Sequence, residues 1–331
     1  MGAEPRGDGG HSRAMPGESW EDLPVMGAGA GRRDYGAYMQ TLTLGDIRID
    51  RVLEQEGPIF GLDFLLPGAP PDLLDANADW LMPRYADPAS RNLILSFHSL
   101  LVRTPTRTIL VDACVGNDKE RPARPPWHQA KFPFLDNLAR HGVSPDDIDI
   151  VLCTHLHADH VGWNTQLLDG RWVPTFPNAT YVFAKREYEY WEVENRAAVP
   201  DEPLNHGSFN DSVLPVVEAG RAQFVADDHE IDHGIWLEPA PGHTPGNIVI
   251  RVEREGARAL LVGDAIHTPA QFADLGLSTR FCSDPAQSAQ TRIRLIDDVA
   301  ETDTALLTAH FPTPTAGRVI RRGDAFGFQD L

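Results

Sequence analysis

Residues 154–160 (THLHADH) constrain this chain more than any other segment. Three histidines and an aspartate follow directly after the β-rich run 148–153 (IDIVLC), and the apolar run 161–163 (VGW) comes next. Burying three imidazoles and a carboxylate without a counter-charge would be costly. A divalent metal removes that cost and accepts these ligand types. The alternative is a solvated histidine-rich loop, which the apolar flanks disfavour, so the segment predicts a metal site at the end of a strand.

The spacing inside this segment suggests two metal positions. His155 and His157 stand two residues apart, so in an extended or turning loop they can face the same ion. If a helix begins near Ala158, Asp159 and His160 turn toward a different point. One short segment can then supply ligands to two neighbouring ions.

Further ligand types stand at the ends of later strand-like runs. His243 lies in the turn 241–246 (PGHTPG), Asp264 follows the run 259–262, and His310 follows the run 304–308. Each is a weak signal alone, because a histidine beside glycine and proline is more often a turn residue. Together, strand runs that end in histidine or aspartate indicate an α/β protein whose site lies on loops at one edge of its sheets.

Composition limits the partners and the compartment. The chain has 29 Lys+Arg against 48 Asp+Glu, a formal charge of −19, which argues against nucleic-acid and membrane-surface partners. Its apolar runs are far shorter than the ~20 residues of a membrane-spanning helix. Three scattered cysteines and an N-terminus without an apolar signal run lead us to expect a cytoplasmic protein.

Residues 1–38 differ from the rest of the chain. They are rich in glycine, with proline, arginine and aspartate, and show no apolar periodicity. Such a segment buries too little surface to offset its ordering entropy, so we expect a mobile arm followed by a single domain at 39–331. The alternative is an arm that clasps a second subunit, which would make a homodimer.

The motifs, their order and their intervals resemble those of the metallo-β-lactamase superfamily. The matching segments are HLHADH at 155–160, PGHTPG at 241–246, Gly263-Asp264 and His310, and the resemblance covers about residues 41–320. It implies an αββα sandwich, and hence a hydrolase domain of this kind at 39–331. It also implies two divalent ions, zinc being the first candidate. The implied ligands are His155, His157 and His243 for one ion, Asp159, His160 and His310 for the other, and Asp264 as a bridge, with Asp112 in support.

Two such ions can hold a shared water as hydroxide near neutral pH and polarise the oxygen of an electrophile. Asp159 or Asp264 would shuttle the proton. We therefore expect hydrolysis of a small-molecule carboxylic ester or lactone. A phosphotriester or sulfate ester is the alternative electrophile, and a non-catalytic, metal-stabilised binding scaffold is the alternative of another class.

Within the superfamily, the chain most resembles the lactonase and organophosphate-hydrolase branches, including the N-acyl-homoserine lactonases. Those lactonases carry a tyrosine three positions after the bridging aspartate, where this chain has His267. An Asp-x-x-His pattern followed by Gln271 is closer to the methyl-parathion-hydrolase-like branch. His267 would hydrogen-bond the substrate or help a proton leave; the alternative is a structural imidazole behind the metals.

Several aromatic residues are candidates for the walls of the substrate pocket, although aromatics at such places are more often core residues. The candidates are a lid formed by Trp127, Phe132 and Phe134, together with Trp163, Phe272 and Phe281 along the cleft. A pocket of this kind would favour a hydrophobic, uncharged ester or lactone.

Overall fold

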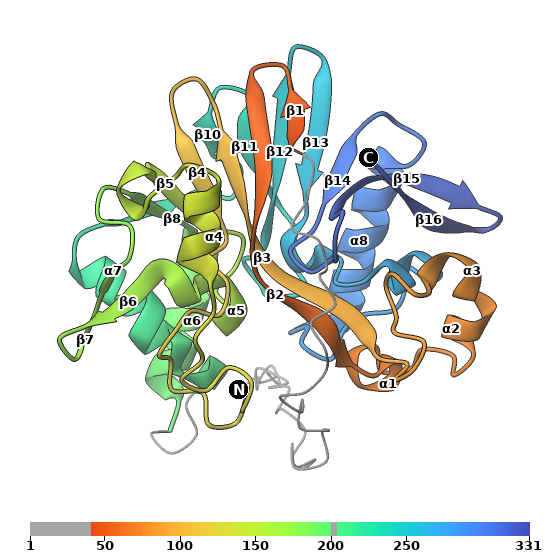
Figure 1. The fold of residues 1–331 in the computed structure, drawn as a ribbon, viewed down its shortest axis with the longest axis horizontal. Helices are drawn as coiled ribbons and strands as arrows, with labels where there is room; N and C mark the ends of the chain where they lie inside the picture. Colours follow the sequence, from red (N-terminus) through yellow and green to blue (C-terminus); the bar gives the residue numbers. More distant parts are fainter. Residues whose placement is uncertain (1–40, 200–203) are drawn as a thin grey trace, which may run out of the picture.

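Two seven-stranded β-sheets form the centre of the fold in the computed structural model, which describes residues 41–199 and 204–331 (Figure 1). The arm expected at 1–38 lies outside the described residues. The first sheet has the order β1 (Leu42–Leu44), β2 (Ile47–Phe60), β3 (Leu93–Arg103), β4 (Thr108–Val111), β5 (Ile150–Cys153), β8 (Thr180–Ala184) and β9 (Ala222–Val225). Its first four strands pair antiparallel, and β4, β5, β8 and β9 pair parallel.

The second sheet takes most of the C-terminal half of the chain. Its order is β10 (Glu230–Asp232), β11 (Ile235–Pro239), β12 (Ile248–Arg254), β13 (Ala257–Leu261), β14 (Ala305–Leu307), β15 (Ala316–Arg322) and β16 (Ala325–Asp330). Only β13 and β14 pair parallel in this sheet. A separate hairpin joins β6 (Thr165–Leu168) to β7 (Arg171–Pro174).

Helices cover the outer face of each sheet (Figure 1). Those beside the first sheet are α4 (Phe134–Arg140), α5 (Ala158–Val161), α6 (Lys185–Ala197) and α7 (Leu214–Glu218). Those beside the second are α8 (Pro285–Val299) and the short helices α1 (Leu62–Leu65), α2 (Leu73–Ala76) and α3 (Ala78–Leu81). Among the residues that the structure describes, no helix combines the length and apolarity needed to cross a membrane.

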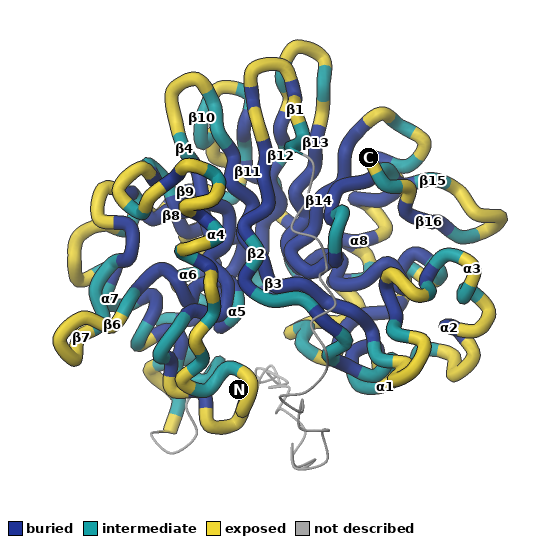
Figure 2. Tube along the Cα trace, in the orientation of Figure 1, coloured by how far each residue is buried: buried dark blue, intermediate teal, exposed yellow. Residues whose placement is uncertain are grey.

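Successive residues of a strand point to opposite faces of its sheet, and both faces are buried here. In β5, Leu152 packs in the cluster between the sheets, whereas Val151 and Cys153 pack in the cluster under α4 and α6. In β14, Leu307 lies between the sheets and Leu306 packs in the cluster that includes α8. The central strands are therefore buried along their length (Figure 2). The layers run helix, sheet, sheet, helix, which confirms the expected αββα sandwich in one domain.

The alternating run 47–53 predicts a strand, and the composition of 134–141 and 285–300 predicts two helices; all three elements are present. The strand expected over 47–53 continues to Phe60 as β2, with register shifts at Leu53/Gln55 and Pro58/Phe60. The helices expected over 134–141 and 285–300 form as α4 and α8. The helical segment at 62–81 and the β15–β16 hairpin lacked a clear periodic signal.

Candidate metal centre

The segment 154–160 leaves β5 and turns at once into the short helix α5. The backbone N–H of Thr154 donates to Oδ1 of Asp112 at 2.7 Å, which ties the turn to the end of β4. His157 is the N-cap residue of α5, so Asp159 and His160 lie on the helix and His155 precedes it. This is the division expected from the spacing of the motif.

Three histidines form the first donor set. Nδ1 of His157 lies 3.1 Å from Nε2 of His155 and 2.8 Å from Nε2 of His243, and the two Nε2 atoms are 3.1 Å apart. Oδ2 of Asp264 joins them, at 3.1 Å from His243 and 3.7 Å from His155. Four donor atoms from three separate loops therefore converge on one point.

A second donor set lies on the other side of the same carboxylate. Oδ1 of Asp264 is 3.2 Å from Nε2 of His160 and 3.1 Å from Nε2 of His310. Oδ2 of Asp159 lies 3.9 Å and 3.7 Å from these two nitrogens. Asp264 thus presents one oxygen to each set, and the structure brings together all seven residues expected as ligands.

The residues present fit divalent metals. Imidazole nitrogens and carboxylate oxygens within 4.8 Å of one another form three such groups among the described residues. Two of them consist of expected ligands: His155, His157, His243, Asp264 and Asp159, His160, His310. The third is Asp264, His267 and His310. Nε2 of His160 and Oδ1 of Asp264 are buried and lie 3.2 Å apart, yet neither atom makes a well-formed hydrogen bond within the described residues. Buried polar atoms rarely stay unpaired, so these atoms are suited to ligate a cation.

The pKa values in the cluster follow from burial and from its carboxylates. Burial and the neighbouring imidazoles hold the pKa of His155 and of His157 well below the ordinary value, so both are neutral, as ligands must be. For His160 burial acts the same way, but Asp264, Asp112 and Asp159 raise its pKa. Burial opposes ionisation of Asp264, yet the surrounding imidazoles keep its pKa well below the usual range.

The outer nitrogens of the ligand histidines also have neighbours. Nδ1 of His160 lies 3.0 Å from Oδ2 of Asp112, the residue expected to act in support, which has a left-handed φ of 58°. Nδ1 of His310 lies 3.0 Å from the carbonyl oxygen of Ser96, and Nδ1 of His243 lies 3.6 Å from Sγ of Cys282. Such partners orient the rings of metal ligands.

Glu187, on α6, was not singled out by its sequence context, yet it connects two of the ligand loops. Its Oε1 accepts from the backbone N–H of Leu156 at 3.0 Å and from the indole of Trp191 at 2.7 Å. Its Oε2 accepts from Oγ1 of Thr244 at 2.8 Å and from the N–H of Gly246 at 3.0 Å. A Cβ at position 246 would lie 2.3 Å from the Glu187 nitrogen, so only glycine permits this approach. Glu187 therefore holds the turn of His243 against the loop of His155 and His157.

Asn205 holds the same loop from another side. Its Nδ2 donates to the carbonyl of Leu156 at 2.7 Å, and its Oδ1 accepts from the N–H of Ala158 at 3.0 Å. His157 stands between these two positions. Asn205 adopts a left-handed conformation, with φ 49° and ψ 40°, which asparagine tolerates better than most residues.

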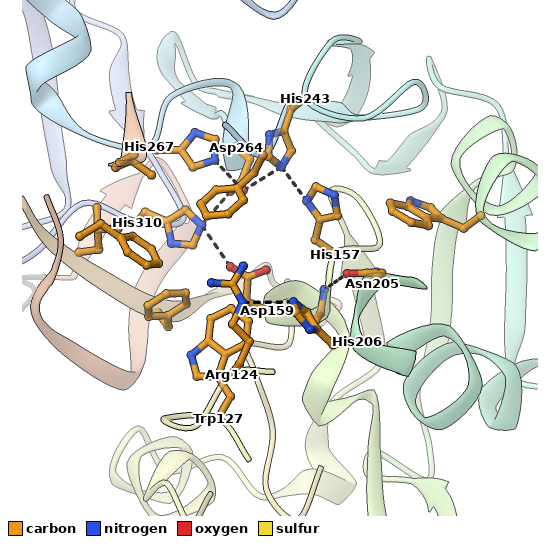
Figure 3. A pocket seen from close by; sticks show the side chains of 17 residues that line it. Arg124, Trp127, His157, Asp159, Asn205, His206, His243, Asp264, His267 and His310 are labelled. Atoms are coloured by element: carbon orange, nitrogen blue, oxygen red, sulfur yellow. Dashed lines mark hydrogen bonds and ion pairs between the residues drawn. The ribbon is translucent and has the colours of Figure 1, made fainter. Parts of the chain in front are cut away.

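The two donor sets open on a cavity of about 420 Å³ (Figure 3). His267 lines it, with Nε2 3.1 Å from Oδ2 of Asp264, and its backbone N–H donates to Oε1 of Gln271 at 2.8 Å. Trp127 and Phe281 line the cavity as expected, together with Phe60 and Phe97.

Other expected pocket residues lie elsewhere. The expected role of Phe134 and Trp163 is wrong: their rings stack at 5.3 Å in the core under the first sheet. Phe272 is buried in the core of the second sheet, with its ring 5.9 Å from Phe328. Phe132 is not among the described residues that line the cavity. The lid is therefore reduced to Trp127, whose loop contributes Arg124 as well.

Comparison with known proteins finds a matching family model and several similar proteins. The family model of the metallo-beta-lactamase superfamily matches residues 98–310. N-acyl homoserine lactonase of Bacillus thuringiensis is 29% identical over 143 residues, which are 43% of this chain and 48% of that protein. AttM, an N-acyl homoserine lactonase of Azorhizobium caulinodans, is 29% identical over 182 residues, 52% of this chain and 61% of that protein. The chain thus spans about half the length of the curated relatives it matches first.

Two solved structures share the fold. The hydrolase AbOPH of the beta lactamase superfamily superposes with a TM-score of 0.72 at 22% identity, covering 88% of this chain and 96% of that one. AidC, a dizinc quorum-quenching lactonase in complex with a product, has a TM-score of 0.66 at 19% identity and covers 88% and 97%. At these identities the likeness concerns the fold.

Proposed function

This chain belongs to the metallo-beta-lactamase superfamily, and from that premise we propose that it is a metal-dependent hydrolase of carboxylic esters or lactones. One observation carries the proposal. The carboxylate of Asp264 faces a different donor set with each of its two oxygens, at 3.1 Å from His243 and 3.1 Å from His310, and it does so at the wall of a cavity. Lactonase relatives at 29% identity support the choice of ester bond.

The proposed cofactor is a pair of divalent cations, zinc first. His155, His157 and His243 would hold one cation, Asp159, His160 and His310 the other, and Asp264 both. When bound, such a pair supplies Lewis-acid activation of water and of a carbonyl oxygen. AidC, a dizinc lactonase with the same fold, supports this assignment.

The remaining chemistry is assigned to side chains that line the cavity. Oδ2 of Asp159 lies at the cavity wall beside His310, where it would take the proton from the attacking water. Asp264 stays ionised throughout, because the surrounding imidazoles hold its pKa low even though burial opposes this. Burial lowers the pKa of His267 to about 4, so its neutral ring would share the Nε2 proton between Asp264 and the substrate oxygen.

The test combines metal analysis with a substrate panel. Protein stripped with a chelator and reloaded with zinc should bind two ions per chain. It should hydrolyse N-hexanoyl homoserine lactone or an aryl ester faster than a phosphotriester. Metal-loaded protein that hydrolyses none of the three would contradict the proposal, and activity on the phosphotriester alone would redirect it to that ester class.

Asp264→Asn tests the bridge itself. The side-chain amide of asparagine has one acceptor oxygen and one NH2 group, so it cannot provide a ligand oxygen to each of the two donor sets. We expect fewer than two zinc ions per chain and a loss of activity of at least ~100-fold. Asp297→Asn is the matched control, because Asp297 is exposed on α8. This variant should bind two zinc ions per chain. If both variants bind two zinc ions per chain, Asp264 is not the bridging ligand.

A further inference from the structure

Arg124 is the one residue with a fixed positive charge among the described residues that line the cavity. In the view of Figure 3, Arg124 and Trp127 lie across the cavity from His243 and His267, with Asp159 between them. The Nε–H of Arg124 donates to Nε2 of His206 at 3.2 Å. Its guanidinium carbon lies 5.4 Å from the ring centroids of both Trp127 and Phe281. The Nε edge and the two rings fix the orientation of the group.

A buried network holds the loop of Arg124 and the loop of His206 together. Arg121 donates to both oxygens of Asp211, at 2.6 and 2.9 Å, and also to the backbone oxygen of His206 at 2.9 Å. The Arg121 side chain is fully buried. His206 has a left-handed backbone, with φ 56° and ψ 22°. A non-glycine residue in that conformation costs about 1 kcal/mol or more, and such strain concentrates where structure serves a site.

The electrostatics of this wall favour an anion. Burial, together with the charges of Arg124 and Arg121, lowers the pKa of His206 to about 4, so its neutral ring accepts the hydrogen bond from Arg124. Burial lowers the pKa of Arg124 to about 10, which leaves it protonated at neutral pH. Two divalent cations would exceed the charge of the lining carboxylates Asp159 and Asp264, so the loaded cavity would be positive. The chain has a formal charge of −19, so its surface elsewhere repels anions, and an anionic substrate would be attracted to the cavity alone.

We propose that Arg124, positioned by His206, binds a carboxylate of the substrate, so that the substrate is an ester or lactone carrying a free carboxylate away from the scissile bond. A guanidinium matches a carboxylate better than it matches a single neutral carbonyl, because its donors form a planar fork. The rings of Phe60, Phe97 and Phe281 would contact the apolar body between the two ends. This inference rests on the proposed function and narrows its substrate class, and it replaces the uncharged ester expected from the aromatic residues alone.

A matched pair of esters tests the inference on the zinc-loaded protein. 4-Nitrophenyl hydrogen adipate carries the free carboxylate, and methyl 4-nitrophenyl adipate has the same chain with that charge masked. We expect kcat/KM for the acid to exceed that for the methyl ester by about 10- to 100-fold, the factor of a charge-assisted hydrogen bond. Arg124→Gln should abolish the preference by lowering kcat/KM for the acid alone, and Arg124→Lys should retain part of it.

Arg280→Gln is the matched control. Arg280 is exposed, lies 3.9 Å over the ring of Phe64 and is not among the described residues that line the cavity. In Arg280→Gln, the ratio of kcat/KM for the acid to kcat/KM for the methyl ester should stay within about twofold of the wild-type ratio. Zinc content, measured in each variant, distinguishes two roles of Arg124. If Arg124 compensates the negative charge of Asp159, its loss lowers the zinc content and slows hydrolysis of both esters equally. If Arg124 contacts the substrate carboxylate, the zinc content is unchanged and only the acid is affected.

Three results would overturn the inference. The first is equal kcat/KM for the two esters in the wild-type protein, a comparison that holds even if Arg124→Gln fails to fold. The second is an equal loss on both esters in Arg124→Gln. The third is the absence of zinc-dependent turnover of either ester, which would overturn the proposed function as well, whereas turnover of the methyl ester without preference for the acid overturns this inference alone.

Discussion

Replacing Glu187 by glutamine tests whether one carboxylate on α6 sets the geometry of the first donor set. The side chain accepts four hydrogen bonds, and an amide must exchange one acceptor oxygen for an NH2 group. The NH2 group should face Thr244, because a hydroxyl can turn to accept while the donors at Leu156 and Trp191 cannot. The backbone N–H of Gly246 then loses its acceptor.

The magnitude follows from these contacts. One buried, unsatisfied N–H costs about 1–3 kcal/mol, and the two bonds that remain on Oε1 lose charge assistance worth about 1 kcal/mol each. Burial raises the pKa of Glu187 despite its four donors, so the neutral amide recovers part of the desolvation cost. The net expectation is a loss of about 2–3 kcal/mol in the free energy of unfolding. Since Leu156 lies between His155 and His157, zinc affinity at that set should fall about 10- to 100-fold.

Two measurements check this reasoning. Urea unfolding of the metal-free protein gives the change in stability, and zinc titration against a chromophoric chelator gives two affinities, of which only one should weaken. Glu189→Gln is the control, because Glu189 lies two residues away on the same helix and is 60% exposed beside Lys185. If both variants unfold within 0.5 kcal/mol of each other, or both zinc sites weaken alike, the clamp assigned to Glu187 is refuted.

Two further predictions concern His267 and Glu54. His267→Phe should slow turnover about 10- to 100-fold while the zinc content stays unchanged; since Asp264, His267 and His310 also form a possible ligand group, a drop in zinc content would make His267 a ligand. Burial raises the pKa of Glu54 to about 7, outweighing its bonds from Val115, Gly116 and Trp163, so the folded state holds this proton more tightly than the unfolded state. Glu54 should therefore cost about 3 kcal/mol of stability as the pH rises from about 4.5 to 7, and urea unfolding of metal-free Glu54→Gln between pH 5 and 8 should lack that decline.

The ligand set could be predicted from the motifs that resemble those of the superfamily, and most of these motifs follow a strand that is largely buried; β11, before His243, is only half-buried. Residues 150–153 and 305–307 are apolar without alternation, which indicates central strands, and polar residues that follow such strands are expected at one edge of the sheets. The C-terminal end of β2 was harder to predict. Gly57 and Pro58 read as strand breakers, yet the register shifts beside them let the strand continue to Phe60.

The supporting residues could not be predicted, because their roles depend on distant contacts. Glu187 and Glu189 stand in the same helix, and nothing local marks the first as buried and the second as exposed. Arg124 and His206 come from loops 82 residues apart and meet only after the chain has folded. Phe134 stands in a segment that resembles a lid, but it begins α4 and is fully buried.

The ligands are divided between the two sheets: His155 to His160 follow β5 of the first, whereas His243, Asp264 and His310 follow strands of the second. Neither half of the polypeptide contains a complete donor set of the kind seen here. During synthesis, the nascent chain can assemble the centre only after β14 has emerged and paired with β13. Each cation needs ligands from both halves of the chain. We therefore expect the cations to bind late in maturation, after the two sheets have packed together, and to stabilise the contact between them.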